Sequence, residues 1–283
     1  MAEEPARAGP DFSPVHFPGG YELPPRPVSG PAAIQDAYRQ SQFLLGKDLQ
    51  LLERLLNTQL TLAHQAARSR EPASRGVLSL WARVYGYLAD GCSLLLQAGY
   101  PSCPPLAVAA SDCVAAQRRI LAQPAPYADW LAGAVAQDPG HAALAIARSS
   151  GGALALDGEL GVVQRLARLL FSPDFGATLL LTGAESGSQR LSLSFAEGTF
   201  HLGWAELIAG WLLSLAGEQL SLVLDCQLFA FSDELRAEVS PLLELVNAAL
   251  ASPNRCRADE VGGRFLFHNM RRGPAATPRR LLL

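Results

Sequence analysis

The stretch "DGCSLLLQAGYPSCPPL", residues 90–106, decides how the chain on either side of it is arranged. Apolar residues at helical spacing run up to Leu96, and Gly99 suits the left-handed position that ends many helices. Pro101 cannot continue a helix, whereas Pro104 or Pro105 fits the first turn of the next one, where a missing N–H costs nothing. The stretch therefore predicts a joint between two packed helices.

Helical periodicity continues on both sides of this joint. One helix is predicted from about residue 74 to 97 and the other from about 105 to 123, the second being alanine-rich on one side. Gly86 and Gly91 lie inside the first of these helices, where glycine costs about 1 kcal/mol relative to alanine. We expect the close approach of a neighbouring backbone to compensate for both.

Towards the N-terminus, polar residues recur at intervals of three, four and seven between residues 32 and 68, and leucines fill the remaining positions. This pattern predicts a long helix that is buried over more than half of its circumference. Residues 1–31 hold eight prolines and four glycines, which predicts a disordered or surface-draped arm. With short helical pieces at 130–136 and 141–150, residues 32–149 are predicted to form an antiparallel helical bundle.

The second half of the chain shows both helix-like and strand-like spacing of its apolar residues. Residues 150–270 are predicted to pack on the bundle, possibly as one continuous domain with it, and residues 271–283 to form a basic tail. The strongest hairpin signal is "RLSLSFAEGTFHL", residues 190–202. Helices are predicted at 160–170, at 204–216 and after Ser232, the last with a kink or restart at Pro241. Residues 220–231 fit a strand and a helix equally well. The segment "RFLFH", residues 264–268, could be a strand. The fold class is mainly α, an antiparallel helical bundle with a β-hairpin or small antiparallel sheet in the C-terminal half; α+β is the alternative.

The amino-acid composition limits the classes of protein to which the chain can belong. Hydrophobic residues make up 49% of the chain and charged residues 17%, so a large core can form. The net charge of −3 gives no field that would attract DNA. Lys47 is the only lysine, and the abundance of Ala, Leu, Gly, Pro and Arg is typical of a GC-rich bacterial genome.

The cysteines and the hydropathy of the chain indicate the cellular compartment in which we expect the protein. The five cysteines are odd in number and never spaced as CxxC, so neither a disulfide framework nor a zinc knuckle is indicated. The first residues show no secretory signal, and the longest apolar run, "LIAGWLLSLAG" at 207–217, is too short to span a bilayer. We expect a cytoplasmic protein that does not enter a membrane.

No catalytic or cofactor-binding motif is recognisable. The sequence lacks GxSxG and Walker motifs, and its five histidines never pair at helical spacing, so we expect neither a cofactor nor a metal. The weak candidates for a site are two residues on the helix before the joint, three on the helix after it and one histidine in the expected hairpin: Arg83, Asp90, Asp112, Arg118, Arg119 and His201. Buried together, such groups would shift one another's pKa values, whereas exposed they are ordinary surface charges. We expect the helical charges to be exposed and His201 to be a half-exposed strand residue.

The segment "LLLQAGYPSCPPLAVAASDCVAAQRRIL", residues 94–121, is similar to helical bundle proteins of the HEPN type, which occur in bacterial defence and toxin systems. The Arg-x4-6-His signature that carries ribonuclease chemistry in that group is missing from this segment. The resemblance therefore implies a helical bundle without implying the activity.

Two hypotheses of function follow. The first is a non-catalytic module that binds a protein partner or a second copy of itself, because amphipathic helices are many and no compact catalytic set is visible. The second is a hydrolase or HEPN-like nuclease that uses the Arg/Asp cluster between helices or a site around His201.

Overall fold

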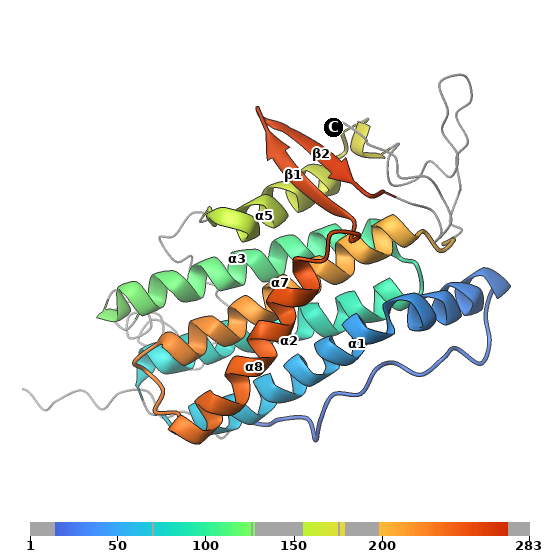
Figure 1. Ribbon diagram of the computed structural model, residues 1–283. Coiled ribbons are helices and arrows are strands. Elements are labelled where there is room, and N and C mark those ends of the chain that lie inside the picture. Colours follow the sequence, from blue (N-terminus) through green and yellow to red (C-terminus); the bar gives the residue numbers. More distant parts are fainter. Residues whose placement is uncertain are drawn as a thin grey trace, which may run out of the picture.

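A computed structural model of the chain describes residues 15–69, 71–125, 127, 155–174, 176–178 and 198–270. The elements, in chain order, are α1 (Ala32–Ala66), α2 (Pro72–Leu96), the short 3₁₀ helix η1 (Tyr100–Ser102), α3 (Cys103–Ala122), α5 (Gly158–Phe171), α7 (Leu202–Asp225), α8 (Asp233–Leu250), β1 (Arg257–Val261) and β2 (Arg264–His268). Long helices lie side by side in a bundle, and the β1–β2 hairpin stands beside α5 at its edge (Figure 1). The prediction of a mainly α fold with a small antiparallel sheet in the C-terminal half is confirmed.

The joint between α2 and α3 forms as predicted, with one correction. Ala98, and not Gly99, has the left-handed conformation, with φ of 56°, whereas φ of Gly99 is −77°. The Gly99 amide donates to the Leu94 carbonyl at 2.8 Å, and the Ala98 amide donates to that of Leu95 at 3.2 Å. These two bonds are those of a Schellman motif, shifted one residue towards the N-terminus from the position that glycine preference alone suggests.

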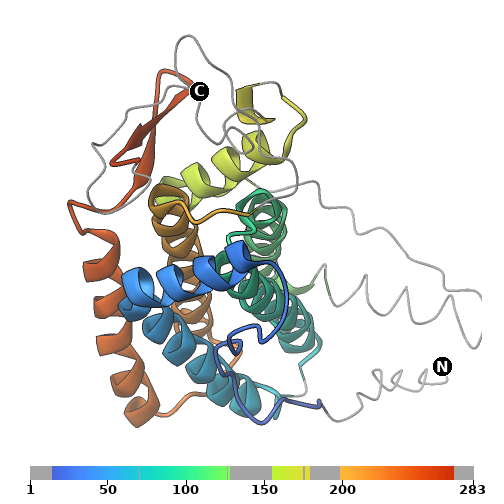
Figure 2. The ribbon, with the colours of Figure 1, turned by 90° about the vertical axis from the view of Figure 1, so that its right-hand side faces the viewer.

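α7 is the central helix of the bundle. It contacts α1, α2, α3 and α8, and both Trp204 and Trp211 are buried. The view along the bundle shows α5 crossing above α3 and α7, with α8 on the outer side (Figure 2). By length and composition α7 could cross a membrane, but 78% of its most apolar window is buried inside the protein, as in the core helix of a folded bundle.

The two alternatives for residues 220–231 are resolved by the structure. α7 continues to Asp225, and an irregular segment with buried Phe229 and Phe231 follows. Ser232 then caps α8 through its hydroxyl, which accepts from the Leu235 amide at 3.3 Å. α8 runs through Pro241 without restarting.

The hairpin does not lie where its strongest sequence signal placed it. Leu202 begins α7 and residues 198–201 are irregular, so the predicted second strand is wrong; residues 190–197 lie outside the described part. The observed hairpin pairs β1 with β2 in antiparallel register, with Asp259 opposite Leu266. Its turn is Gly262–Gly263, with φ of 59° and 75°, which suits a tight type I′ turn. "RFLFH" is therefore a strand, and its partner was missed.

The two glycines inside α2 differ from the expectation and from each other. A Cβ atom on Gly91 would lie 2.8 Å from Cδ2 of Leu212, so α7 approaches closely here through a side chain rather than its backbone. A Cβ on Gly86 would meet no atom within 4 Å among the described residues. Close packing therefore accounts for Gly91, and nothing in the structure explains Gly86. The short helices predicted at 130–136 and 141–150 and the tail at 271–283 lie outside the described residues.

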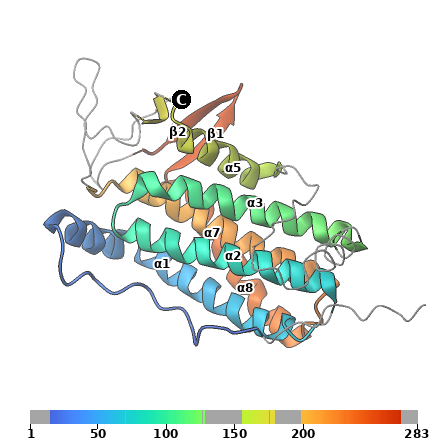
Figure 3. The ribbon, with the colours of Figure 1, turned by 180° about the vertical axis from the view of Figure 1, so that it is seen from behind.

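The N-terminal arm, residues 15–31, lies in an irregular, extended course along α1 and α2 (Figure 3). The Asn57 side chain holds it by two bonds to one residue: Oδ1 accepts from the Tyr21 amide at 2.9 Å, and Nδ2 donates to the Tyr21 carbonyl at 2.8 Å. The Tyr38 hydroxyl donates to the Pro24 carbonyl at 2.7 Å. Polar side chains of α1 thus form hydrogen bonds with backbone groups of the arm, which has no secondary structure to supply them.

Candidate functional site

The candidate charges on α2 and α3 do not form one cluster. On α2, Arg83 and Asp90 are exposed, and Arg83 donates to the Tyr87 hydroxyl at 2.7 Å while its guanidinium lies 5.6 Å from the Tyr87 ring centre. The bond to Tyr87 raises the pKa of Arg83. Arg119 on α3 is also exposed. These three residues belong to the outer surface of the bundle.

Asp112 and Arg118 are half-buried, and each turns to a different helix. Asp112 forms an ion pair with Arg168 of α5 and accepts from Nε2 of Gln164 at 2.7 Å. Arg118 forms an ion pair with Glu218 of α7. Both candidates therefore join α3 to a neighbouring helix, and neither faces the α2 candidates.

His201 caps a helix rather than lying in a strand. Its Nδ1 accepts from the Trp204 amide at 3.3 Å at the start of α7, and its own amide donates to the Tyr100 hydroxyl at 3.2 Å. The imidazole acceptor is thus engaged in capping, which is a structural task.

A small polar hollow of about 290 Å³ adjoins the Arg118–Glu218 pair. Asp157, Ser221 and Asn247 are among the residues that line it. The positive charge of Arg118 is already matched by Glu218. Within the described ranges, no three His, Cys, Asp or Glu side chains converge in the manner of metal ligands.

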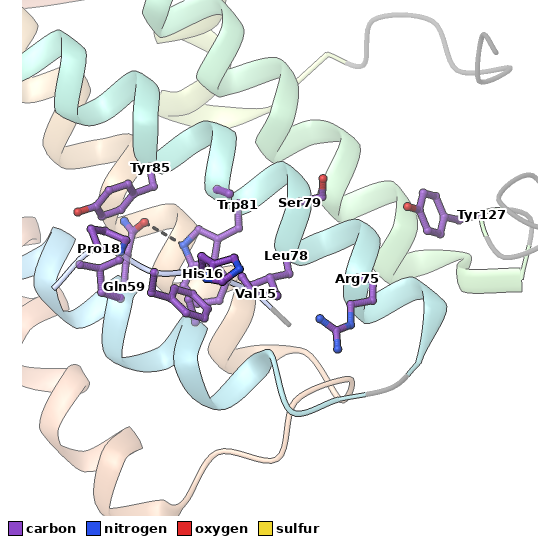
Figure 4. Close-up of a pocket in the computed structure, with 14 residues that line it drawn as sticks. Val15, His16, Pro18, Gln59, Arg75, Leu78, Ser79, Trp81, Tyr85 and Tyr127 are labelled. Atoms are coloured by element: carbon purple, nitrogen blue, oxygen red, sulfur yellow. Dashed lines mark hydrogen bonds between the residues drawn. The ribbon is translucent and has the colours of Figure 1, made fainter. Parts of the chain in front are cut away.

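A larger cavity, of about 570 Å³, lies between α1, α2 and the arm. Its lining consists of Gln59, Leu60 and Ala63 from α1, Arg75, Leu78, Ser79, Trp81, Ala82 and Tyr85 from α2, residues 15–18 of the arm, and Tyr127. Its volume lies within the range of about 300–1,000 Å³ that is typical of small-molecule sites. Figure 4 shows Trp81 in the middle of the cavity, Tyr85 and Pro18 towards one end, and Arg75 and Tyr127 towards the other.

Small side chains are part of the cavity lining on both helices. Ala63 of α1 and Ser79 and Ala82 of α2 are among the lining residues, and none of them has a large side chain. Leu78 and Ala82 are four residues apart, as are Gln59 and Ala63, so each helix presents these residues on one face. Trp81 forms the floor; its Nε1 donates to Oε1 of Gln59 at 2.9 Å (Figure 4).

The arm completes the wall on the open side. The Phe17 ring lies over His64 of α1, with 4.0 Å between ring centres. The Tyr21 ring meets the edge of Tyr85 at 6.4 Å and an interplanar angle of 87°. These contacts, with the Asn57 bonds to Tyr21, hold residues 15–18 against the cavity.

Aromatic and apolar groups dominate the lining, and its phenols are neutral near pH 7. Burial raises the pKa of both Tyr85 and Tyr127 above the ordinary value for tyrosine. Arg75 is the one permanently charged residue in the described lining, which contains no Asp or Glu. The cavity can thus hold an apolar body, and the permanent positive charge of its described lining lies at the Arg75 end.

Sequence reasoning missed this site because it contains no motif. Phe17 lies in an arm that the sequence distinguishes only by its prolines and glycines, and the lining residues of α1 and α2 follow no pattern beyond that of their helices. A scan of protein-family models, a search of curated proteins and a search of solved structures each find no match to this chain.

Proposed function

We propose that this protein is a non-catalytic binding protein, and that the cavity between α1, α2 and the arm takes up a small, largely apolar molecule. The observation that carries the proposal is the cavity of about 570 Å³, with Trp81 as its floor and aromatic side chains along its length. An apolar molecule moved from water into such a cavity leaves its hydration shell, which favours binding by about 25 cal/mol for each Å² buried.

The proposal keeps the non-catalytic part of the sequence-based hypothesis and replaces the protein partner with a small molecule. The large apolar side chains that are exposed in the described residues are spread over separate elements, such as Phe43 on α1, Phe171 on α5 and Val261 on β1. A protein interface needs a contiguous patch. The concave cavity suits a compact ligand better than a partner surface.

The hydrolase or nuclease hypothesis needs acids and bases that face a common space. Among the described residues, Asp112 and Arg118 are engaged with α5 and α7, while Arg83, Asp90 and Arg119 face outwards. His201 caps α7. This arrangement supports binding over catalysis.

The test uses N-phenyl-1-naphthylamine, an uncharged aromatic probe that becomes fluorescent when it leaves water. We expect saturable binding of one probe per chain. Ala82 is exposed and lines the cavity, so Ala82→Phe fills the site without disturbing the core and should weaken probe binding. Ala237→Phe, at an exposed position on α8, is the matched control and should bind as the wild type does. Absence of saturable binding, or equal binding by both variants, would refute the proposal.

A further inference from the structure

The first described residues of the arm, 15–18, border the cavity but are held to the bundle by few contacts. Phe17 is half-buried, and the other three residues are exposed, following the row of α2 side chains that line the cavity (Figure 4). Within the described structure, residues 15–20 take part in no hydrogen bond. The specific contact of this segment there is the Phe17 ring over His64, with 4.0 Å between ring centres.

Directly after this segment the arm is fixed to the bundle. Tyr21 forms two backbone hydrogen bonds with the Asn57 side chain, at 2.9 and 2.8 Å, and its ring meets the edge of Tyr85. Three residues further along, the Pro24 carbonyl accepts from the Tyr38 hydroxyl at 2.7 Å. The arm is therefore anchored from residue 21 onwards.

Gly19 and Gly20 join the loosely held segment to the anchored one. Both are exposed, neither lies in a helix or strand, and neither has a positive φ. A Cβ atom on Gly19 would meet no described atom within 4 Å, and one on Gly20 would lie 3.5 Å from Oδ1 of Asn57, which is an ordinary contact. Neither packing nor backbone strain thus requires glycine at these positions. Two adjacent glycines do give the backbone an unusually wide range of φ and ψ angles.

We propose that residues 15–18 form a lid on the cavity, which swings about Gly19–Gly20 while Tyr21 stays anchored. Opening of this lid sets how fast a ligand enters and leaves, as in many sites that a mobile segment covers. The contact between Phe17 and His64 holds the lid closed. The inference rests on the proposed function, because the lid acts on the same cavity.

Stopped-flow fluorescence of N-phenyl-1-naphthylamine with the full chain measures the two rate constants that the lid controls. Association is followed after protein and probe are mixed, and dissociation after the complex is mixed with excess β-cyclodextrin, which captures released probe. His64→Ala removes the contact that holds the lid, at an exposed position outside the cavity lining. It should raise both rate constants by about two- to tenfold, the factor that one aromatic contact is worth. The dissociation constant should stay unchanged, because the closed lid is weakened equally with and without the probe.

The opposite perturbation stiffens the hinge. The double variant G19A/G20A restricts the backbone, and both new Cβ atoms fit the closed arrangement. It should lower both rate constants, by about two- to fivefold for each glycine replaced, because fewer open conformations remain accessible. Glu22→Gln, at an exposed position of the arm outside the cavity lining, is the control and should leave both rate constants as in the wild type.

The outcomes separate the lid from the binding site. Saturable binding with the same rate constants in the wild type, His64→Ala and G19A/G20A would overturn the lid while the proposed function stands. A change in the dissociation rate constant alone would also overturn it, because His64 would then act on the bound probe and not on access to the cavity. Absence of saturable binding would remove the proposed function, and the lid with it.

Discussion

Replacing Gln117 with leucine should destabilise the protein, and replacing its partner Gln219 as well should restore stability. The two side chains are fully buried between α3 and α7 and bond to each other reciprocally: Nε2 of Gln117 donates to Oε1 of Gln219 at 2.7 Å, and Nε2 of Gln219 donates to Oε1 of Gln117 at 2.8 Å. Each amide is thus the partner of the other in the dry interior.

The magnitude follows from the groups left behind. In Gln117→Leu, the surviving amide of Gln219 keeps one buried donor and one buried acceptor without partners, at about 1–3 kcal/mol each, or about 4 kcal/mol together. The apolar leucine returns about 1–2 kcal/mol through its burial. The expected net loss is about 2–3 kcal/mol for either single variant. In the double variant no polar group is stranded, so its free energy of unfolding should lie within about 1 kcal/mol of the wild type or above it.

Urea denaturation followed by far-UV circular dichroism gives the free energy of unfolding of the wild type, the two single variants and the double variant, which together form a double-mutant cycle. Gln50→Leu, at an exposed position on α1, is the matched control and should change the free energy of unfolding by less than about 0.5 kcal/mol. The reasoning is refuted if the double variant loses the sum of the two single losses, because additive costs would mean that the amides do not satisfy each other.

Three further perturbations test other features. Gly161→Ala should lower the melting temperature, because a Cβ there would lie 2.2 Å from the backbone carbonyl oxygen of Leu156. Arg255→Met should lower the free energy of unfolding by about 3–5 kcal/mol, because it leaves the Asp48 carboxylate without its ion-pair partner in a buried site. The Arg255 and Asp48 side chains are 9% and 15% exposed. Burial raises the pKa of Cys92 to about 11 and that of Cys103 to about 12. Thiols of the unfolded chain ionise first, at about pH 8.5, so the free energy of unfolding should fall as the pH rises from there to about 11.

Each of these three predictions has its own check. Gly86→Ala, where the new Cβ meets no described atom within 4 Å, should stabilise α2 and not weaken it. Arg165→Met removes a more exposed ion pair with Glu260 and should cost far less than Arg255→Met. A free energy of unfolding that stays constant between pH 8.5 and 11 would contradict the burial of the two thiols.

Local signals in the sequence determined the helices and the joint between α2 and α3. Helical periodicity depends on residues three and four apart, and the prolines at 101, 104 and 105 restrict the backbone wherever they occur. For this reason α1, α2, α3 and α5 lie within a few residues of their predicted ranges. The N-cap of α8 at Ser232 is equally local, and it too was predictable.

Tertiary structure decided which polar residues are buried and where the chain leaves a cavity. The sequence does not distinguish three buried glutamines from other polar helix residues. In the folded chain Gln59 bonds to Trp81, and Gln117 bonds to Gln219, which places all three in the interior. A hairpin forms at 257–268, whereas the described end of the stronger signal, residues 198–202, is irregular up to the first residue of α7, Leu202. The cavity is lined by residues of two helices and of an arm held by Asn57, which meet only after folding. Such features arise from contacts between residues far apart in the chain, which short-range periodicity does not encode.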